Sequence, residues 1–383
     1  MTPASSGVHP DRPPSTDLVS PVLLLINTLG VGGAERYVVT VGNWFAERGA
    51  DVTVAAMDGP MAADLRPDVR FIPTPLQDVR LSLPRAVLRV RRIIQEVRPQ
   101  VVIANSLVVS WVARLARPAR PVPMVTVAHG WPADRYRQVG PLIAVADRVV
   151  AVSPDVRQRL VDGGLDPQRC EVVFNGVDLS PFGRRTGEAR RRARRAMGAG
   201  DDDIVVINVG RLSAQKAHHH VVAIAAALCR RLPAVRFAIA GDGRRRDELA
   251  SRISAAGLED RVRLLGARRD VPDLLGSADI YLSTSDWEGM PLSTIEAMAS
   301  GLPIVATATE GSGQLLTPTS GVVVPVGDTD AMLQAVAELA EDPDRRAAMG
   351  TAARQRAIDH FSHDRMVGEL AAIARRVAVG GAG

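Results

Sequence analysis

Short apolar runs alternate with amphipathic stretches along almost the whole chain after residue 20. The runs are four to eight residues long and rich in Val, Ile and Leu, as the buried strands of parallel sheets are. The predicted strands are 21–27, 51–57, 69–73, 100–105, 123–128, 148–153 and 170–176, then 204–210, 235–241, 262–266, 279–285, 302–307 and 321–326. Two successive β/α series predict an α/β protein with two Rossmann-like domains, each a doubly wound parallel sheet.

The alternation is interrupted once, by a highly charged segment without a strand at residues 181–203. We expect a linker with a solvated helix there, between an N-terminal domain at 21–180 and a C-terminal domain at 204–360. The last amphipathic stretch, 361–383, is predicted to be a helix. Residues 1–20 are rich in Pro, Ser and Thr and have no apolar core segment, so we expect a disordered leader and not a signal peptide.

Composition narrows the classes of function. The chain has 383 residues, a net charge of +5 and a pI near 9.9. Only 3% of its residues are aromatic, and its arginines are scattered along the chain among 42 acidic residues. Both features argue against nucleic-acid binding. Its apolar runs are too short to span a bilayer, and Cys170 and Cys229 form no metal or disulfide pattern. We therefore expect a cytoplasmic protein that binds no nucleic acid.

Glycines and charged residues gather directly after predicted strands. In the first half "TLGVGGAER" follows the first strand, "HG" the fifth and "NGVD" the seventh. In the second half "GRLSAQK", "GDG" and "DWEGM" follow the first, second and fourth strands. Because open parallel sheets bind ligands at the carboxyl ends of their strands, we expect these six segments to line one cleft between the domains.

The glycine-rich segment after the first strand admits two interpretations. Gly32 and Gly33 at the start of a helix would let backbone N–H groups approach a phosphate or a sugar. Alternatively, Gly30-x-Gly32 begins a dinucleotide-binding fingerprint, with Asp58 at the end of the next strand. Glu35 argues against the second interpretation, because it occupies the third glycine position and would crowd a pyrophosphate.

Arg211 and Lys216 lie on the loop after the first strand of the second half. Lys216 is the only lysine among 47 basic residues, which singles out its compact ammonium group. Two cations can neutralise a diphosphate, arginine through a bidentate fork and lysine as a point charge. His129, at a strand end predicted to face the same cleft, is either a site residue or a structural one.

Two glutamates, Glu288 and Glu296, stand eight positions apart in "DWEGMPLSTIEAM". Pro291 suits the first turn of a helix that runs to about Ser300. The free N–H groups at its start, residues 289–292, would form an anion site. Glu296 has apolar neighbours, and a buried carboxylate needs a partner, for which ligand hydroxyl groups would serve.

Together these segments, with "VSPDVRQRL" and "ADIYLSTSDWEGMPLSTIEAMASGLPIVAT", resemble the retaining GT-B glycosyltransferases of family 4. The resemblance covers nearly the whole chain beyond residue 20. Its most specific part is the pair of glutamates with an arginine and a lysine upstream. It implies a nucleoside-diphosphate sugar in the C-terminal domain, an acceptor in the N-terminal domain, and a last helix, from about Phe361, that crosses back to the N-terminal domain.

The resemblance also assigns roles. Arg211 and Lys216 would hold the diphosphate, Glu288 would contact hydroxyls of the donor sugar, and Glu296 would bind those of the ribose. The implied catalytic residues are His129, Arg211, Lys216 and Glu288. The implied donor-binding residues are Gly32, Gly33, Arg211, Lys216, Gly289, Met290, Pro291, Leu292 and Glu296. No metal or other cofactor is expected, because two cations and a helix end would neutralise the diphosphate.

Several features depart from the family pattern or suggest other sites. Ala217 stands where a glycine usually follows the lysine, and Gln314 stands where the family often has an acid. The histidines 218–220 suggest a metal site, but consecutive residues on a helix point in different directions. The D-x-D sequence at 328–330 matches a metal-binding pattern, yet it precedes a helix and is predicted to be its N-cap.

The expected activity is transfer of a sugar, with retention of configuration, from a nucleoside-diphosphate sugar to an acceptor. A UDP-sugar is favoured over a GDP-sugar. The alternatives are a sugar-nucleotide epimerase of the same fold, an NAD-dependent dehydrogenase and a nucleotide-sugar binder without activity. The acceptor is either a small molecule or lipid-linked. The basic amphipathic stretch 81–98 suits peripheral contact with the inner face of a membrane, and equally the simple covering of a sheet.

Overall fold

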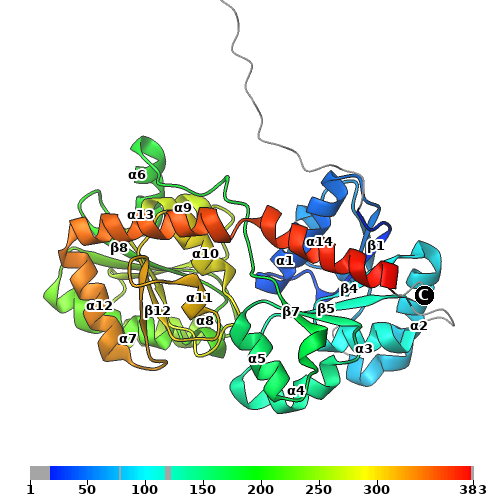
Figure 1. Cartoon of the computed structure of the whole chain (residues 1–383). Helices are drawn as coiled ribbons and strands as arrows, with labels where there is room; N and C mark the ends of the chain where they lie inside the picture. Colours follow the sequence, from blue (N-terminus) through cyan, green and yellow to red (C-terminus); the bar gives the residue numbers. More distant parts are fainter. Residues whose placement is uncertain (1–17, 77–78, 117–121, 381–383) are drawn as a thin grey trace, which may run out of the picture.

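The computed structural model describes residues 18–76, 79–116 and 122–380 (Figure 1). Over these residues a seven-stranded parallel sheet forms the N-terminal domain and a six-stranded parallel sheet the C-terminal domain. The predicted fold class, α/β with two Rossmann-like domains, is confirmed. The leader expected at 1–20 lies outside the described residues except for its last three.

The N-terminal sheet has the strand order β3-β2-β1-β4-β5-β6-β7. Its strands are β1 (Val22–Thr28), β2 (Val52–Met57), β3 (Arg70–Pro73), β4 (Val101–Ala104), β5 (Met124–Ala128), β6 (Arg148–Ala151) and β7 (Cys170–Val172). Its helices are α1 (Gly33–Glu47), α2 (Val79–Val97), α3 (Leu107–Ala116), α4 (Tyr136–Ile143) and α5 (Pro154–Asp162), with 3₁₀ turns η1 (Pro60–Asp64), η2 (Ala133–Arg135) and η3 (Pro167–Arg169).

The C-terminal sheet has the strand order β10-β9-β8-β11-β12-β13. Its strands are β8 (Ile204–Val209), β9 (Val235–Ala240), β10 (Val262–Gly266), β11 (Ile280–Ser283), β12 (Ile304–Thr307) and β13 (Gly321–Val324). The linker helix α6 (Gly187–Ala196) precedes them. The turn η4 (Ala214–Lys216) and the helices α7 (His219–Arg231), α8 (Arg246–Ala255), α9 (Val271–Ser277), α10 (Leu292–Ala299), α11 (Ser312–Leu315), α12 (Thr329–Glu341), α13 (Pro343–His360) and α14 (His363–Gly380) follow.

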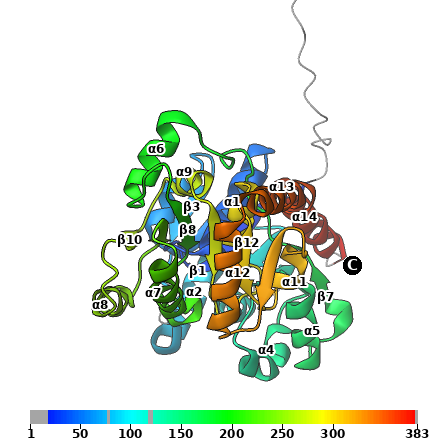
Figure 2. The same ribbon diagram turned by 90° about the vertical axis from the view of Figure 1, so that its left-hand side faces the viewer.

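Helices cover both faces of each sheet, so the strands carry apolar side chains at successive positions. Along β1, for example, residues 22–25 are completely buried. In the N-terminal domain α2, α3 and α4 pack side by side in that order, and α1 packs beside α14. In the C-terminal domain α7 and α12 lie next to each other (Figure 2). This arrangement leaves the loops at the carboxyl ends of the strands free to build a site.

All the predicted strands occur, each within a few residues of its predicted bounds. The largest difference is β7, which ends at Val172 and not at 176. Its last predicted residues leave the sheet, because the chain there approaches the segment before α14. A Cβ atom on Gly176 would lie 2.2 Å from the Ser362 carbonyl oxygen. Tertiary packing, which the hydrophobic pattern does not report, thus shortens this strand.

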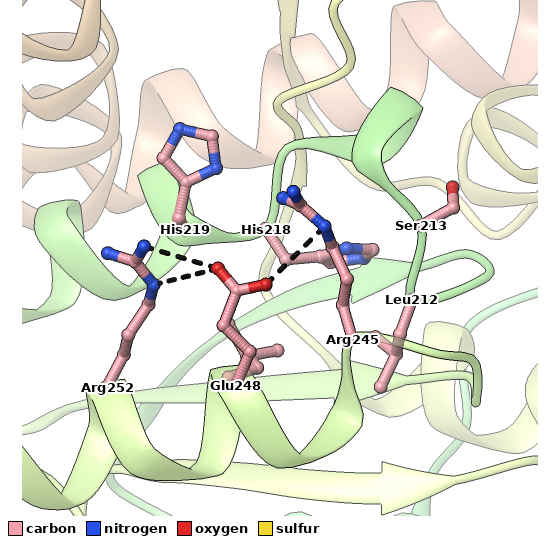
Figure 3. A pocket seen from close by; sticks show the side chains of 8 residues that line it. Leu212, Ser213, His218, His219, Arg245, Glu248 and Arg252 are labelled. Atoms are coloured by element: carbon pink, nitrogen blue, oxygen red, sulfur yellow. Dashed lines mark hydrogen bonds and ion pairs between the residues drawn. The ribbon is translucent and has the colours of Figure 1, made fainter.

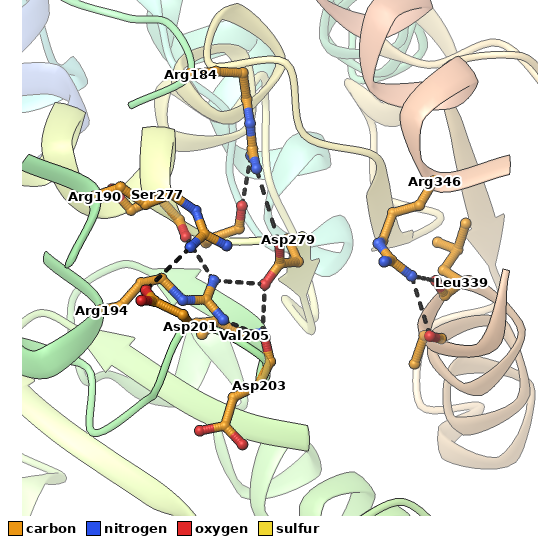
Figure 4. Close-up of polar contacts among 12 residues, drawn as sticks. Arg184, Arg190, Arg194, Asp201, Asp203, Val205, Ser277, Asp279, Leu339 and Arg346 are labelled. Carbon is orange, nitrogen blue, oxygen red and sulfur yellow. Dashed lines mark hydrogen bonds and ion pairs between the residues drawn. The ribbon is translucent and has the colours of Figure 1, made fainter. Parts of the chain in front are cut away.

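The prediction of a solvated linker helix was wrong for one side of α6. The Arg194 side chain is 1% exposed (Figure 4). Its guanidinium donates to Asp279 Oδ2 at 2.9 Å, to the Ser277 carbonyl at 3.0 Å and to the Gly200 carbonyl at 2.8 Å. A buried arginine is tolerated when its donors are satisfied in this way. These bonds fix α6 to the C-terminal domain.

The two crossings between the domains lie side by side. The Val177 N–H donates to the Phe361 carbonyl at 3.0 Å, and the His363 N–H donates to the Val177 carbonyl at 2.9 Å. Beyond this bridge α14 packs on the N-terminal domain, where Trp44 Nε1 donates to Asp364 Oδ1 at 2.7 Å. Figure 1 shows α13 and α14 running one after the other along the two domains. Helix α14 therefore returns from the C-terminal domain to the N-terminal domain.

Candidate active site

The single lysine and the first glutamate of the pair form an ion pair. Lys216 Nζ lies 2.5 Å from Glu288 Oε1, and the two side chains are only 17% and 10% exposed. Ser285 Oγ donates to the same glutamate oxygen at 2.8 Å. Lys216 follows β8 and Glu288 follows β11, which are neighbouring strands of the sheet. The fold therefore brings together two residues that lie 72 positions apart.

Hydrogen bonds between the two loops fix this pair. Thr284 Oγ1 donates to the Lys216 carbonyl at 2.9 Å, and the Asp286 N–H donates to the Gln215 carbonyl at 2.8 Å. Ala217 then turns the chain in a left-handed conformation, with φ +45° and ψ +42°. A glycine would adopt this conformation freely, whereas an alanine does so at a cost of roughly 1 kcal/mol. The departure from the family pattern therefore falls on a strained residue.

The second glutamate lies inside α10 and is buried. The helix begins at Leu292, so Pro291 is its extended N-cap and not part of its first turn as predicted. Glu296 is 8% exposed, and Arg36 of α1 reaches it from the other domain with Nε 3.9 Å from Oε1. Burial raises the pKa of Glu296 to about 7, against the opposing charges of Arg36 and Lys216. A carboxyl group so loosely paired has acceptor capacity for hydroxyl groups of a ligand.

His129 directly follows β5, on the side of the N-terminal domain that meets these loops. Its ring packs edge-to-face on Tyr37, with the centroids 5.0 Å apart. Its Nε2 lies 3.4 Å from Asn105 Oδ1. Burial lowers the pKa of His129 to about 4, so the imidazole is neutral near pH 7. It can therefore donate or accept a hydrogen bond without bringing a charge.

The two domains meet at this point through bare backbone. A Cβ atom on Gly289 would lie 2.1 Å from the His129 carbonyl oxygen, and one on Gly311 would lie 2.3 Å from the Gly289 carbonyl oxygen. Gly130 has φ +100°, and a Cβ atom there would lie 2.9 Å from the Gly289 Cα. A side chain at Gly289 would therefore push the two domains apart.

A buried asparagine holds the start of α10 from the N-terminal side. Asn175 is 4% exposed, and its Nδ2 donates to the Met290 carbonyl at 2.7 Å. Its own N–H donates to Met290 Sδ at 3.2 Å. The sequence placed "NGVD" at a strand end facing the cleft but gave Asn175 no role. In the structure Asn175 connects the two domains by these hydrogen bonds, next to the predicted anion site.

The glycine loop after β1 meets the other predicted cation. Gly32 is the N-cap of α1, and a Cβ atom on it would lie 2.4 Å from Arg211 Nη2 and 2.3 Å from Glu35 Oε2. Gly33 faces Leu292 Cδ1, with a Cβ-to-carbon distance of 3.9 Å. Arg211 thus reaches across to the N-terminal domain. The Glu35 carboxylate stands where a dinucleotide pyrophosphate would approach the helix, which disfavours that interpretation.

A buried acid that was not predicted from the sequence lies beside Glu288. Glu310 is 8% exposed, and its Oε2 accepts a hydrogen bond from the Glu288 N–H at 3.3 Å. Arg159 of α5 approaches it from the N-terminal domain, with Nε 3.7 Å from Oε1. Gln314, in the amide orientation that its neighbours favour, donates to Asp155 Oδ2 and to the Glu310 carbonyl, both at 3.1 Å. Glu310 could have been found, because it follows the carboxyl end of β12.

The features that suggested a metal have other partners. His218 is buried with Nε2 2.9 Å from Asn208 Oδ1, and burial lowers its pKa to about 4. Asp328 caps α12 by accepting from the Ala331 N–H at 2.9 Å, as predicted for the D-x-D sequence. Among the described residues, no cluster of His, Cys, Asp and Glu side chains has the makings of a metal site.

His219 belongs to a separate hollow, lined also by Arg245, Glu248 and Arg252 (Figure 3). Glu248 lies between the two arginines, with Arg245 Nε 3.5 Å from Oε2 and Arg252 Nη2 3.2 Å from Oε1. The hollow measures about 10 Å³, which is room for one water molecule at most. We therefore assign no ligand to it.

Comparison with known proteins identifies the family. The family model described as Glycosyltransferase Family 4 matches residues 31–181, and the model described as Glycosyl transferases group 1 matches residues 189–356. The D-inositol 3-phosphate glycosyltransferase of Salinispora tropica is 31% identical over 387 residues, covering 88% of this chain and 80% of that protein. This chain belongs to the family 4 glycosyltransferases. The dehydrogenase alternative is thereby set aside.

A further relative and a solved structure are similar to this glycosyltransferase. The UDP-Gal:alpha-D-GlcNAc-diphosphoundecaprenol alpha-1,3-galactosyltransferase of Escherichia coli is 30% identical over 46% of this chain and 47% of its own length. The crystal structure of Anabaena Alr3699/HepE in complex with UDP and glucose has a TM-score of 0.79 at 23% identity, covering 92% of this chain and 98% of that one. The second comparison confirms the predicted GT-B fold.

No helix in the described part of the glycosyltransferase is both long enough and apolar enough to span a bilayer.

Proposed function

We propose that this glycosyltransferase moves a sugar from a nucleoside-diphosphate sugar to an acceptor hydroxyl with retention of anomeric configuration. The Lys216–Glu288 ion pair at the start of α10 carries the proposal. It places a compact cation and an acid with two hydrogen-bonding oxygens beside the free N–H groups of a helix. These are the groups that a negatively charged phosphate and the hydroxyls of a sugar require.

The donor would lie along α10. Lys216 and Arg211 would neutralise the diphosphate. The backbone N–H groups of Gly289, Met290 and Leu292 would assist them, whereas Pro291 has no N–H group to donate. Glu288 would bind hydroxyls of the sugar, and Glu296 would bind those of the ribose. Glu288 precedes α10 and Glu296 lies in its second turn, so the two acids would bind the two sugars at opposite ends of the diphosphate. Neutralisation by two cations and a helix end requires no metal.

The reaction would be a displacement on one face of the donor sugar. The bond between the anomeric carbon and the phosphate oxygen breaks first, and its electrons stay on the diphosphate, where Arg211 and Lys216 stabilise them. The acceptor oxygen then bonds to the anomeric carbon from the same side, and its proton passes to the departing phosphate oxygen. This route needs no separate general base, in keeping with a neutral His129 that would position the sugar.

The choice of nucleotide and of acceptor rests on the relatives. Anabaena Alr3699/HepE was crystallised with UDP, and the Escherichia coli relative carries UDP-Gal in its name, which supports a UDP-sugar over a GDP-sugar. The Salinispora relative is named for an inositol phosphate and the Escherichia coli relative for a lipid-linked diphosphate. Both acceptor classes therefore stay open, namely a small soluble molecule and a lipid-linked one.

A thermal-shift panel of UDP, UDP-sugars, GDP and GDP-sugars tests the donor site. UDP-sugars are expected to raise the melting temperature, because a ligand that binds only the folded state stabilises it. The same panel on Glu296→Gln should show a weakened response to every nucleotide, whereas the exposed Glu341→Gln should respond as the parent does. If no nucleotide sugar stabilises the parent protein, the donor site is wrong.

A product assay tests the stereochemistry. With a donor identified by the panel, an acceptor library and proton NMR of the glycoside formed should show the anomeric configuration of the donor. An inverted product would contradict the displacement on one face. Conversion of the donor sugar without any acceptor would instead indicate the epimerase.

A further inference from the structure

Exposed apolar side chains are concentrated on one side of the N-terminal domain. Eleven large apolar side chains of the described residues are exposed, and six of them belong to α2, α3 and α4: Leu83, Leu88, Val108, Trp111, Leu115 and Leu142. These three helices pack against one another in that order. Single exposed apolar residues are normal, whereas a gathering of them marks an interaction surface.

The spacing along α3 places its exposed apolar residues on one stripe. Val108, Trp111 and Leu115 are three and four positions apart, and their exposures are 43%, 37% and 51%. The opposite side of the same helix, including Val109 and Val112, is fully buried in the core. The fold therefore uses only the inner stripe of α3, and the outer stripe has no structural need to be apolar.

The neighbouring helix α2 adds positive charge on its outer face. Arg85, Arg89, Arg91 and Arg92 are exposed there, and no carboxylate of the described residues forms an ion pair with them. The nearby acid Glu96 is paired with Arg70 of β3. Among the described residues, the outer face of α2 therefore carries four arginines without a carboxylate partner.

An open hollow continues the surface between α3 and α4. It has a volume of about 560 Å³, and its lining includes Trp111, Arg114, Pro141, Val145 and Arg169. The lining mixes an indole and aliphatic groups with two guanidinium groups and the Asp147 carboxylate. The apolar stripe of α3 therefore passes into a concave region that holds apolar groups and two arginines beside one acid.

We propose that this surface docks on an anionic lipid bilayer. It is named here the basic apolar face, and it consists of the six apolar residues above with Arg85, Arg89, Arg91, Arg92 and Arg114. Interfacial helices present apolar side chains to the acyl boundary and cations to lipid phosphates, and tryptophan is favoured at that boundary. A second copy of the chain would bring the uncompensated arginines of both copies together, which disfavours a dimer. Figure 1 shows α2 and α3 on the side of the N-terminal domain away from the C-terminal domain, so docking leaves the C-terminal domain free.

The proposal relocates the membrane contact expected for residues 81–98. The charge lies on α2, but most of the apolar residues lie on α3 and α4. The α4 helix also follows the His129–Gly130 turn at the proposed site by only a few residues. A docked enzyme would therefore keep its acceptor side close to the bilayer. The docking itself does not depend on the proposed reaction.

Flotation of the full chain with vesicles tests the proposal. Binding is expected to vesicles of phosphatidylglycerol and phosphatidylcholine, to weaken as salt rises, and to be at least about tenfold weaker with phosphatidylcholine alone. The variant Trp111→Ser/Leu115→Ser and the variant Arg89→Gln/Arg92→Gln should each lower the partition coefficient at least about tenfold, since each arginine contributes about fivefold. Quenching of tryptophan fluorescence by brominated lipid should be largely lost in the first variant.

The matched control replaces exposed apolar residues elsewhere. Val326 and Ile358 are 43% and 47% exposed in the C-terminal domain, and Val326→Ser/Ile358→Ser should bind vesicles as the parent does. Each variant should keep the parent's melting temperature and its shift with UDP, which separates this test from that of the donor site. Equal loss in the control, no binding to anionic vesicles, or a dimer that the Trp111 variant dissociates would overturn the proposal.

Discussion

The two halves of the candidate site differ in the chemical groups that they present. The C-terminal half is made of charged side chains held in place, such as Lys216 and Glu288 at 2.5 Å and the buried Glu296. The N-terminal half presents mostly backbone and neutral groups, namely the His129 carbonyl against Gly289 and a histidine whose burial lowers its pKa to about 4. The difference indicates that one half supplies electrostatic binding and the other supplies shape and position.

This division makes distinct demands on substitution. Removing a charge from the C-terminal half should lower the rate of reaction and change the stability through an unpaired partner. Adding atoms to the contact with the N-terminal half should change the distance between the domains while the charges stay in place. Substitutions in each half therefore test whether the two halves differ in this way.

The largest effect is expected for Lys216→Ala. Loss of the ammonium should lower the turnover number about 100-fold to 1,000-fold, because a positioned cation no longer stabilises the departing diphosphate. Glu288 is then left without its partner, so the free energy of unfolding should fall as well. Steady-state kinetics of UDP release and urea denaturation measure the two effects.

A double variant separates them. Lys216→Ala/Glu288→Gln removes both charges and should recover much of the lost stability, but none of the lost activity. Arg231→Ala, an exposed cation on α7, should behave as the parent protein in both assays. Near-normal turnover in Lys216→Ala would refute the role of the charged half.

The next effect is expected for Gly289→Ala, which alters shape without altering charge. The added Cβ atom has its nearest neighbour at the His129 carbonyl oxygen, 2.1 Å away, so the domains must separate. A displacement of about 1 Å between reacting groups can lower a rate about 100-fold. We expect a loss of that order in turnover, a smaller change in UDP affinity, and a larger radius of gyration by small-angle scattering.

The matched control for this variant is Gly313→Ala, two positions beyond Gly311. A Cβ atom there meets nothing within 4 Å, so activity should stay within about twofold of the parent. Equal activity of the two alanine variants would show that the backbone contact does not set the position of the domains.

Much of the fold could be predicted because parallel strands buried on both faces leave a continuous apolar signal. The charged half of the site was predictable for a related reason. Lys216 and Glu288 are charged residues on loops that follow strand ends, and Glu296 is an acid among apolar neighbours within α10. The bound of α10 was wrong by one residue, since Pro291 can cap a helix or begin it and both choices suit its φ angle.

The N-terminal half was less predictable because its features exist only between segments. The contact of Gly130 with Gly289 joins loops of different domains, and a glycine alone does not report what approaches it. The burial of Arg194 depends on carbonyls of two other segments. Glu310 lies four positions before Gln314, the position at which the family often has an acid, so the family pattern does not single it out.

Two buried groups predict opposite dependences of stability on pH. The pKa of Glu296 is raised from 4.5 to about 7, so its contribution is full below pH 4.5 and is lost as the pH rises through 7. The pKa of His129 is lowered from 6.5 to about 4, so its contribution is full above pH 6.5 and is lost as the pH falls through 4. In the parent protein the two slopes largely cancel between pH 4.5 and 6.5.

In Glu296→Gln the pH dependence of stability that His129 causes should no longer be cancelled by that of the glutamate. Relative to the parent, the free energy of unfolding of the variant should rise by up to about 3 kcal/mol between pH 4.5 and 8. Urea denaturation at pH 4.5, 6 and 8 measures this difference, with the exposed Glu341→Gln as the control. If the free energies of unfolding of the parent and of Glu296→Gln change in parallel with pH, burial of the Glu296 carboxylate does not destabilise the folded protein.

The smallest effect is expected for Arg159 and Glu310, which join the halves by charge as Arg36 and Glu296 also do. Their closest atoms are 3.7 Å apart and the Arg159 side chain is 43% exposed, so the pair should contribute no more than about 1 kcal/mol. Arg159→Gln and Glu310→Gln should each lower turnover less than about fivefold, since the amide oxygen introduced by the second substitution could still accept from the Glu288 N–H. A double-mutant cycle measures the coupling between them. A coupling well above about 1 kcal/mol in turnover would show that the N-terminal half also contributes charge to the reaction, and the division between an electrostatic half and a positioning half would then fail.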